Sequence, residues 1–375
     1  MDKRVYWVWL TNLSGMFSHK INALLDYFDD IEEIYKATDY TNVEGITRTD
    51  SFVLNNKDLT KAKKLIEETE KIGGKILTFD DINFPDSVRR IENPAYVLYV
   101  KGEIMQWDRI LPIAVIGTRE CSDYGIAVTK SISYHLAKRG ITIVAGMARG
   151  IDGMAARAAL EAGNKTIAVL GSGLDVVYPP EHKDLMENII NHGTVITEYP
   201  LGSQALKHHF PERNRIISAL SKGVLVVEAP KISGALITAN YAQTQGKDIF
   251  AVPGSIFEDN CKGTNRLIAE GAKIATCAMD IMKEYPKDMA RLVPIEDYDK
   301  KINNIRHISP DDEKYANLNA NEKKVILALI ESNMHIEDLK RETCIDITSL
   351  NSMLPMLEMM GFIRKLPGDN YKLEV

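Results

Sequence analysis

The feature that most constrains the fold is an alternation between residues 110 and 282, where short apolar runs are separated by helical stretches of about 10 to 14 residues. The runs are almost continuously apolar, which is typical of parallel strands buried on both faces. This alternation predicts an α/β fold with a doubly wound, mostly parallel sheet. The predicted strands are Ile113 to Ile116, Ile141 to Ala145, Ile167 to Leu170, Thr194 to Glu198, Val224 to Val227 and Ile249 to Val252. The glycines expected to end the helices are Gly140, Gly163, Gly193, Gly246 and Gly271.

The segments on either side of this region follow different patterns. Apolar residues at helical spacing before residue 75 predict a small all-helical module. Lys75 to Phe79 and Tyr96 to Val100 are predicted strands that lead into the sheet. After residue 320, three helical segments and a two-stranded hairpin match the winged-helix pattern. We therefore expect a helical module over 1–75, the sheet domain with its lead-in over 76–282, a linker over 283–320 and a winged-helix domain over 321–375.

The composition excludes several classes of protein. No apolar run approaches the roughly 18 to 20 residues that a membrane span needs, so we expect no membrane association. The four cysteines form no CxxC pair, which disfavours a zinc knuckle or a disulfide framework and favours a cytoplasmic protein with reduced thiols. The net charge of −6 is unevenly distributed, because residues 111–282 contain 17 Lys and Arg against 16 Asp and Glu, and the rest contains 29 against 36. The overall charge therefore does not exclude a nucleic-acid partner for the central region.

Glycines and basic residues follow the ends of the predicted strands. The carboxyl ends of parallel strands meet at one edge of a sheet, so these residues are expected to lie close together. Glycine turns let backbone amides approach an anion, and the five basic side chains among these residues add positive charge. The edge therefore favours a phosphate-containing ligand. The candidate binding residues are Gly117, Thr118, Arg119, Arg149, Gly171, Ser172, Lys207, Phe210, Arg213, Asn214, Arg215 and Ser233.

The usual nucleotide-binding motifs are missing from the sequence. The first turn lacks GxGxxG and no GxxxxGK[ST] occurs, which disfavours a dinucleotide enzyme and a P-loop NTPase. The segment 202–220 instead combines cations with Phe210, as single-stranded nucleic acid requires: cations contact phosphates and a ring stacks on a base. A structural alternative stays open, in which Phe210 fills the core and the arginines pair with Glu198, Glu212 or Glu228. No catalytic set or metal site is indicated, and Asp152 is well placed to begin a helix.

Seven blocks of sequence together resemble the DNA-processing protein A family, also called DprA or Smf. They are GTRECSDYG from Gly117, AGMARGIDGMA from Ala145, AVLGSGLDVVYPPEH from Ala168, TEYPLG from Thr197, HFPERNRIISALS from His209, VVEAPKISGALITANYA from Val226 and FAVPGSIFEDNCKGTNRLIAEGA from Phe250. The resemblance implies a Rossmann-like central domain, an N-terminal module similar to a sterile-alpha-motif domain, and the C-terminal winged helix that some members have. It also implies binding and protection of single-stranded DNA in natural transformation, loading of the RecA recombinase, and a homodimer.

The resemblance assigns roles to individual residues. It makes Arg119 and Lys207 DNA-binding cations and Phe210 the base-contacting ring, and it places Arg213 and Arg215 in the RNR element of the same surface. The family is not known for turnover chemistry, so no enzymatic activity and no cofactor are expected.

The C-terminal segment differs from a duplex-reading winged helix. Residues 321–375 contain 7 basic and 9 acidic residues, and the expected reading helix, Thr348 to Met360, has no Lys or Arg. Its methionines and leucines indicate a packing or partner face, so we expect DNA binding to depend on the central domain. Two other functions remain open. One is a nucleotide-processing enzyme of the phosphoribohydrolase kind, whose Pro-Gly-Gly-x-Gly-Thr turn is not supplied by Pro253-Gly254-Ser255. The other is a scaffold that binds protein partners.

Overall fold

The computed structural model describes residues 2–107, 109–292, 318–331, 333–343 and 345–374. The chain divides into two compact units, Met1–Val293 and Pro294–Val375, and each is described by itself. The helical module and the sheet both belong to the first unit. Most of the predicted linker lies outside the described residues, but its first part forms the helix α14 (Pro286–Leu292). Among the described residues, no helix has the length and apolar character to cross a membrane.

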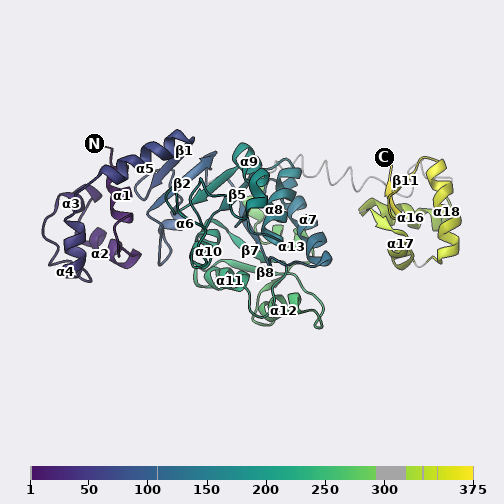
Figure 1. Ribbon diagram of the computed structural model, residues 1–375. Coiled ribbons are helices and arrows are strands. Elements are labelled where there is room, and N and C mark those ends of the chain that lie inside the picture. The colour runs from purple at the N-terminus through teal and green to yellow at the C-terminus, as the bar shows by residue number, and fades with distance from the viewer. Residues whose placement is uncertain (1, 108, 293–317, 332, 344, 375) are drawn as a thin grey trace. The chain divides into compact units, whose positions relative to one another are not determined.

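The first unit is built on a nine-stranded sheet with the order β1-β2-β6-β5-β4-β3-β7-β8-β9 (Figure 1). The strands from β6 through β9 in this order are parallel, and β1 and β2 form an antiparallel extension at one side. The doubly wound, mostly parallel sheet is thereby confirmed. Its strands are β1 (Gly74–Thr78), β2 (Val97–Gly102), β3 (Pro112–Ile116), β4 (Thr142–Ala145), β5 (Thr166–Val169), β6 (Thr194–Thr197), β7 (Gly223–Val226), β8 (Asp248–Ala251) and β9 (Lys273–Ile274). The two-residue strand β9 has no counterpart in the sequence prediction.

Helices cover both faces of the sheet because successive side chains of each strand point in opposite directions. Ile113 and Val115 of β3 pack in one core with α7, α8 and α13, whereas Ala114 and Ile116 pack in another with α6, α10 and α11. The helices are α6 (Asp86–Arg89), α7 (Asp123–Lys138), α8 (Ile151–Glu161), α9 (Lys183–His192), α10 (His209–Leu220), α11 (Gly234–Thr244), α12 (Lys262–Ala269) and α13 (Ala278–Met282). Burial of both faces explains why the strands read as continuous apolar runs.

Glycine stands at the five expected helix ends for two different structural reasons. Gly140, Gly163, Gly246 and Gly271 have the positive φ angles of left-handed helix ends. Gly193 follows α9 with an extended φ of −170°, and a Cβ added there would lie only 2.2 Å from the carbonyl oxygen of Thr166. Close packing, rather than a left-handed conformation, therefore requires glycine at this position.

The N-terminal helical module packs directly on the antiparallel side of the sheet. Its helices are α1 (Arg4–Thr11), α2 (Ser18–Tyr27), α3 (Ile31–Lys36), α4 (Arg48–Leu54) and α5 (Thr60–Lys71). Trp7 of α1 stacks on Tyr96 with ring centroids 6.1 Å apart, and the apolar core of the module continues to Val97 and Tyr99 of β2. The module and the sheet therefore share one core.

The second unit has the winged-helix arrangement predicted from the sequence. It consists of α16 (Ala320–Glu331), β10 (Met334–His335), α17 (Ile336–Thr343), α18 (Ile347–Met359), β11 (Ile363–Leu366) and β12 (Asn370–Leu373), with the strand order β10-β12-β11. Only β10 was not expected. Leu354 and Leu357 of α18 are buried in the core, whereas Met356 and Met359 are exposed. The apolar run of α18 therefore divides into a packing side and a solvent side.

Candidate nucleic-acid interface

An open groove of about 670 Å³ lies beyond the carboxyl end of β3 in the first unit. Three segments form most of it, namely the turn after β3, the start of α10 and the loop that leads into α11, and residues after β4 and β5 complete it. The helices α10 and α11 lie together over the same part of the sheet (Figure 1). Of the twelve predicted binding residues, those that line the groove are Gly117, Thr118, Arg119, Lys207, Phe210, Arg213, Asn214 and Ser233.

Arg119 and Lys207 provide exposed positive charge in the groove. Within the described residues, neither side chain forms an ion pair or a hydrogen bond with the protein. The guanidinium carbon of Arg119 lies 5.1 Å from the centroid of the Phe210 ring, within the range of a cation–π contact. Both cations are therefore available to an anionic ligand.

Phe210 is half-buried and lines the groove, so it is not a plug of the hydrophobic core. Its ring packs against Tyr178 with centroids 5.2 Å apart. A Cβ added at Gly171 would lie 3.1 Å from the ring. Gly171 therefore gives space to Phe210, and it is not among the residues that line the groove. The part of the ring that faces the groove remains available for stacking.

Arg213 corrects one prediction, because its guanidinium is not a free cation. The residue is 3% exposed and donates to the carbonyl oxygens of Gly146, at 2.8 Å, and of Val169. These carbonyls lie at the carboxyl ends of β4 and β5, so Arg213 holds the two strand ends together. Burial lowers the pKa of Arg213 to about 10, which leaves it charged at neutral pH.

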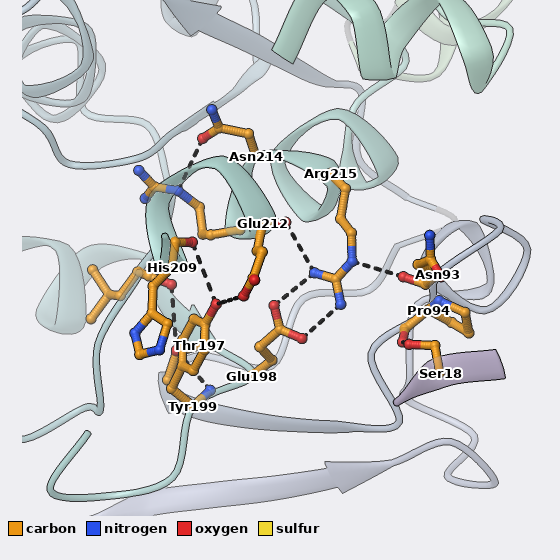
Figure 2. A network of polar contacts seen from close by, with 12 residues as sticks. Ser18, Asn93, Pro94, Thr197, Glu198, Tyr199, His209, Glu212, Asn214 and Arg215 are labelled. Carbon is orange, nitrogen blue, oxygen red and sulfur yellow. Dashed lines mark hydrogen bonds and ion pairs between the residues drawn. The ribbon is translucent and has the colours of Figure 1, made fainter. Parts of the chain in front are cut away.

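Arg215 corrects a second prediction. It forms a two-oxygen ion pair with Glu198, at 2.6 and 2.7 Å, and its Nε donates to the carbonyl oxygen of Asn93 at 2.7 Å (Figure 2). The side chain is 11% exposed. The structural alternative considered for the arginines therefore holds for Arg215 and Glu198. It does not hold for Glu228, whose carboxylate accepts from the backbone amide and hydroxyl of Ser122.

The network around Arg215 extends from α10 to the helical module. Asn93 and Pro94 belong to the loop before β2, and the hydroxyl of Ser18 in α2 donates to the carbonyl oxygen of Pro94 at 3.4 Å (Figure 2). On the other side, the Tyr199 hydroxyl donates to Glu212 at 3.0 Å. Arg215 therefore fixes α10, which bears Phe210, against the loop that contacts the helical module.

Two backbone amides in the glycine turns after β3 and β4 form hydrogen bonds within the protein. The Gly146 amide donates to Oδ2 of Asp152 at 2.9 Å. In the turn after β3, the amide of Thr118 donates to the carbonyl oxygen of Glu228 at 2.8 Å. Burial raises the pKa of Asp152, while the charge of Arg213 and the hydrogen bond from the Gly146 amide favour its ionised form.

The other predicted residues lie outside the groove or already form hydrogen bonds within the protein. Arg149 is exposed outside the groove lining and pairs with Glu181. Ser172 is buried and its hydroxyl donates to the carbonyl oxygen of Val176 at 2.9 Å, which corrects its assignment as a ligand contact. Asn214 lines the groove but donates to the carbonyl oxygen of Gly234 at 3.3 Å, and Ser233 lines it while capping α11.

Sequence reasoning missed two side chains of the groove wall. Ile232 is 94% exposed in the loop before α11, and Tyr178 supports the Phe210 ring. No signal in the sequence indicated Ile232, because its exposure follows from the tertiary structure and single exposed apolar residues are common on protein surfaces. Nothing in the local sequence indicated that Tyr178 would reach Phe210.

Most of the chain matches known protein families. Residues 75–286 match the family described as DNA recombination-mediator protein A, and residues 309–369 match the DprA winged helix domain. The chain belongs to the DNA recombination-mediator protein A family. Within this family it is 31% identical to Protein Smf of Synechocystis over 99% of both chains, and 36% identical to DNA processing protein DprA of Streptococcus pneumoniae over 75% of this chain and 98% of the relative.

Solved structures of the same family have the same fold. The X-ray structure of DprA from Streptococcus pneumoniae superposes with a TM-score of 0.66 at 33% identity, over 76% of this chain and 98% of that chain. A DprA structure from Helicobacter pylori superposes with a TM-score of 0.52 at 32% identity, over 57% of this chain and 96% of that chain. The Helicobacter pylori structure is described as giving insight into a single-stranded DNA binding mode.

Proposed function

We propose that this chain binds and protects single-stranded DNA and helps to load the RecA recombinase onto it during natural transformation. The observation that supports this most directly is the groove in which Arg119 and Lys207 are unpaired and Phe210 offers part of its ring. Phosphates would contact the two cations, and a base would stack on the ring. Neither contact distinguishes one base from another, so the binding should depend little on sequence.

The absence of turnover chemistry is part of this proposal. The buried carboxyl group of the groove lining is that of Asp152, which is 7% exposed and already accepts a hydrogen bond from the Gly146 amide, so it is poorly placed to reach a substrate. The Helicobacter pylori relative supports single-stranded DNA as the ligand, and the family description as a recombination mediator supports delivery to a recombinase. The expected cytoplasmic location fits both partners.

We also propose that the working unit is a homodimer formed by the sheet domain. The strand β9 at one end of the sheet exposes Ile274, and Met279 in the neighbouring α13 is exposed as well. Apolar side chains beside an open sheet edge favour association. The winged helix is not proposed to read DNA, since α18 has no basic residue.

The test is a titration of the full chain with labelled oligothymidine and with duplex DNA of equal length, at two salt concentrations. We expect tighter binding to the single strand and an affinity that falls as salt rises. Equal or tighter binding to the duplex would contradict the proposal. Delivery is tested separately, by measuring the rate of RecA filament formation on oligothymidine that this chain already covers. An unchanged or slower rate would contradict the loading role.

A further inference from the structure

A buried glutamate holds the turn between β3 and α7, which carries the groove cation Arg119. This glutamate, Glu228, lies two residues after β7 and is 1% exposed. Its carboxylate accepts hydrogen bonds from the backbone amide of Ser122, at 3.0 Å, and from the Ser122 hydroxyl. Its backbone carbonyl oxygen accepts from the amide of Thr118 at 2.8 Å. One residue therefore holds the turn on both sides of Arg119.

Two glycines leave room for Glu228. A Cβ added at Gly125, in the first turn of α7, would lie 2.3 Å from Oε2 of Glu228. A Cβ added at Gly117 would lie 2.8 Å from the carbonyl oxygen of Glu228. Such approaches are closer than packed atoms tolerate, so a side chain at either position would displace Glu228. The glycines at both ends of the GTRECSDYG block therefore fit the place that this residue occupies.

The orientation of Arg119 depends on the backbone of this turn. In the part of the chain that the structure describes, the Arg119 side chain forms no ion pair or hydrogen bond with the protein, and its guanidinium carbon lies 5.1 Å from the centroid of the Phe210 ring. The carbonyl oxygen of Glu120, the next residue, accepts from the side-chain amide of Asn260 at 2.9 Å. The turn is thus fixed while the cation that it carries stays free for a ligand.

We propose that Glu228 is a positioning residue for DNA binding, which keeps the turn in the shape that presents Arg119 to a phosphate group. The inference rests on the proposed function, because it concerns how one of the DNA-binding cations is held. Glu228 does not line the groove, so it acts through Arg119 and not by touching DNA. A cation that is already in place loses less conformational freedom on binding, so its contact contributes more to the affinity.

The test is a double-mutant cycle with labelled oligothymidine, in which Glu228→Ala is made in the wild-type chain and in Arg119→Ala. In the wild-type chain this change should weaken binding by about 2- to 12-fold, the effect expected when one flexible side chain must be ordered on binding. In Arg119→Ala it should have no further effect, whereas a general loss of structure would weaken binding in both backgrounds. Glu228→Gln can accept from the Ser122 amide and donate to the Ser122 hydroxyl, so it should restore most of the affinity.

A matched control removes a buried hydrogen bond from α7 outside the turn. The Thr129 hydroxyl donates to the carbonyl oxygen of Gly125 at 2.6 Å, and Thr129→Val removes this bond without changing Glu228. Its affinity for oligothymidine should equal that of the wild-type chain. If Glu228→Ala does not fold, Ser122→Ala takes its place in the cycle, because it removes the hydroxyl contact from the other side.

Several results would overturn the inference. Wild-type affinity in the folded variant would show that the turn presents Arg119 without this carboxylate. An equal loss in both backgrounds, or a Glu228→Gln variant as weak as Glu228→Ala, would show that the effect does not pass through the position of Arg119. Hydrogen exchange of the segment 118–125 should be slow in the wild-type chain and in Glu228→Gln and faster in Glu228→Ala, and fast exchange in the wild-type chain would contradict the inference without reference to DNA. Absence of oligothymidine binding by the wild-type chain would instead refute the proposed function.

Discussion

Replacement of Phe210 by alanine should weaken binding of oligothymidine by about 5- to 150-fold. Stacking of one base on an aromatic ring contributes about 1 to 3 kcal/mol, and each 1.4 kcal/mol is about a tenfold change in affinity. The half-buried ring lies between the Tyr178 ring, whose centroid is 5.2 Å from its own, and the Arg119 guanidinium carbon, which is 5.1 Å from its centroid. Only the groove-facing part of the ring is therefore available to a base. One stacked base is therefore the basis of this range.

The dependence of affinity on salt should not change in this variant. The ring has no charge, so its loss releases no counterion, whereas loss of a cation would lower the slope. Fluorescence anisotropy of labelled oligothymidine at four or more salt concentrations separates the two effects. The thermal unfolding of each variant, measured alongside, shows whether the fold is retained.

Two further variants complete the Phe210 experiment. Phe257→Ala removes a highly exposed ring that does not line the groove, and its affinity should equal that of the wild-type chain. Phe210→Leu keeps an apolar side chain but removes the aromatic face, and it should bind almost as weakly as the alanine variant. Wild-type affinity in Phe210→Leu would refute stacking as the role of this residue.

Other variants test the structural roles assigned above. Arg213→Ala should lower the free energy of unfolding by about 1 to 3 kcal/mol for each of the two carbonyl oxygens, those of Gly146 and Val169, that lose this buried donor. A urea midpoint close to that of the wild-type chain would contradict this. Arg215→Ala breaks the buried ion pair with Glu198 and should also lower the urea midpoint. Arg149→Ala breaks an exposed ion pair and should leave the midpoint unchanged. The hydrogen bond from the Thr276 backbone amide is the main reason that the pKa of Asp280 lies well below its usual range. The stabilisation from Asp280 is therefore present above a pH of about 4 and lost below it, so Asp280→Asn should flatten the fall of Tm in acid.

The parallel strands could be predicted from sequence because burial on both faces leaves a direct trace in the residues. Ile113 and Val115 face one core, and Ala114 and Ile116 face the other, so every position of β3 must be apolar. The short strand β9 left no such trace, since Lys273 and Ile274 are both exposed at the end of the sheet. Its pairing with β8 is set by the tertiary fold.

The binding residues were harder to predict, because a cation near a strand end can be either a ligand contact or a structural bond. Arg213 precedes Ile216, Ile217 and Leu220 by three, four and seven residues, which places it on the buried face of α10. This signal was present in the sequence. The pairing of Arg215 with Glu198 was foreseen only as one of several possibilities. The hydrogen bond from the Gly146 amide to Asp152 depends on how the turn after β4 folds back on the start of α8, and no local pattern indicates it.

The central claim is that DNA phosphates are bound by the unpaired cations of the groove and not by the buried arginines. The most direct measurement is the slope of log affinity against log salt for oligothymidine with the wild-type chain, Arg119→Ala, Lys207→Ala and Arg149→Ala. The account predicts a slope lowered by about 0.7 for each of the first two variants, if each contacts one phosphate, and no change for Arg149→Ala. Unaltered slopes in both Arg119→Ala and Lys207→Ala, with the fold retained, would contradict it.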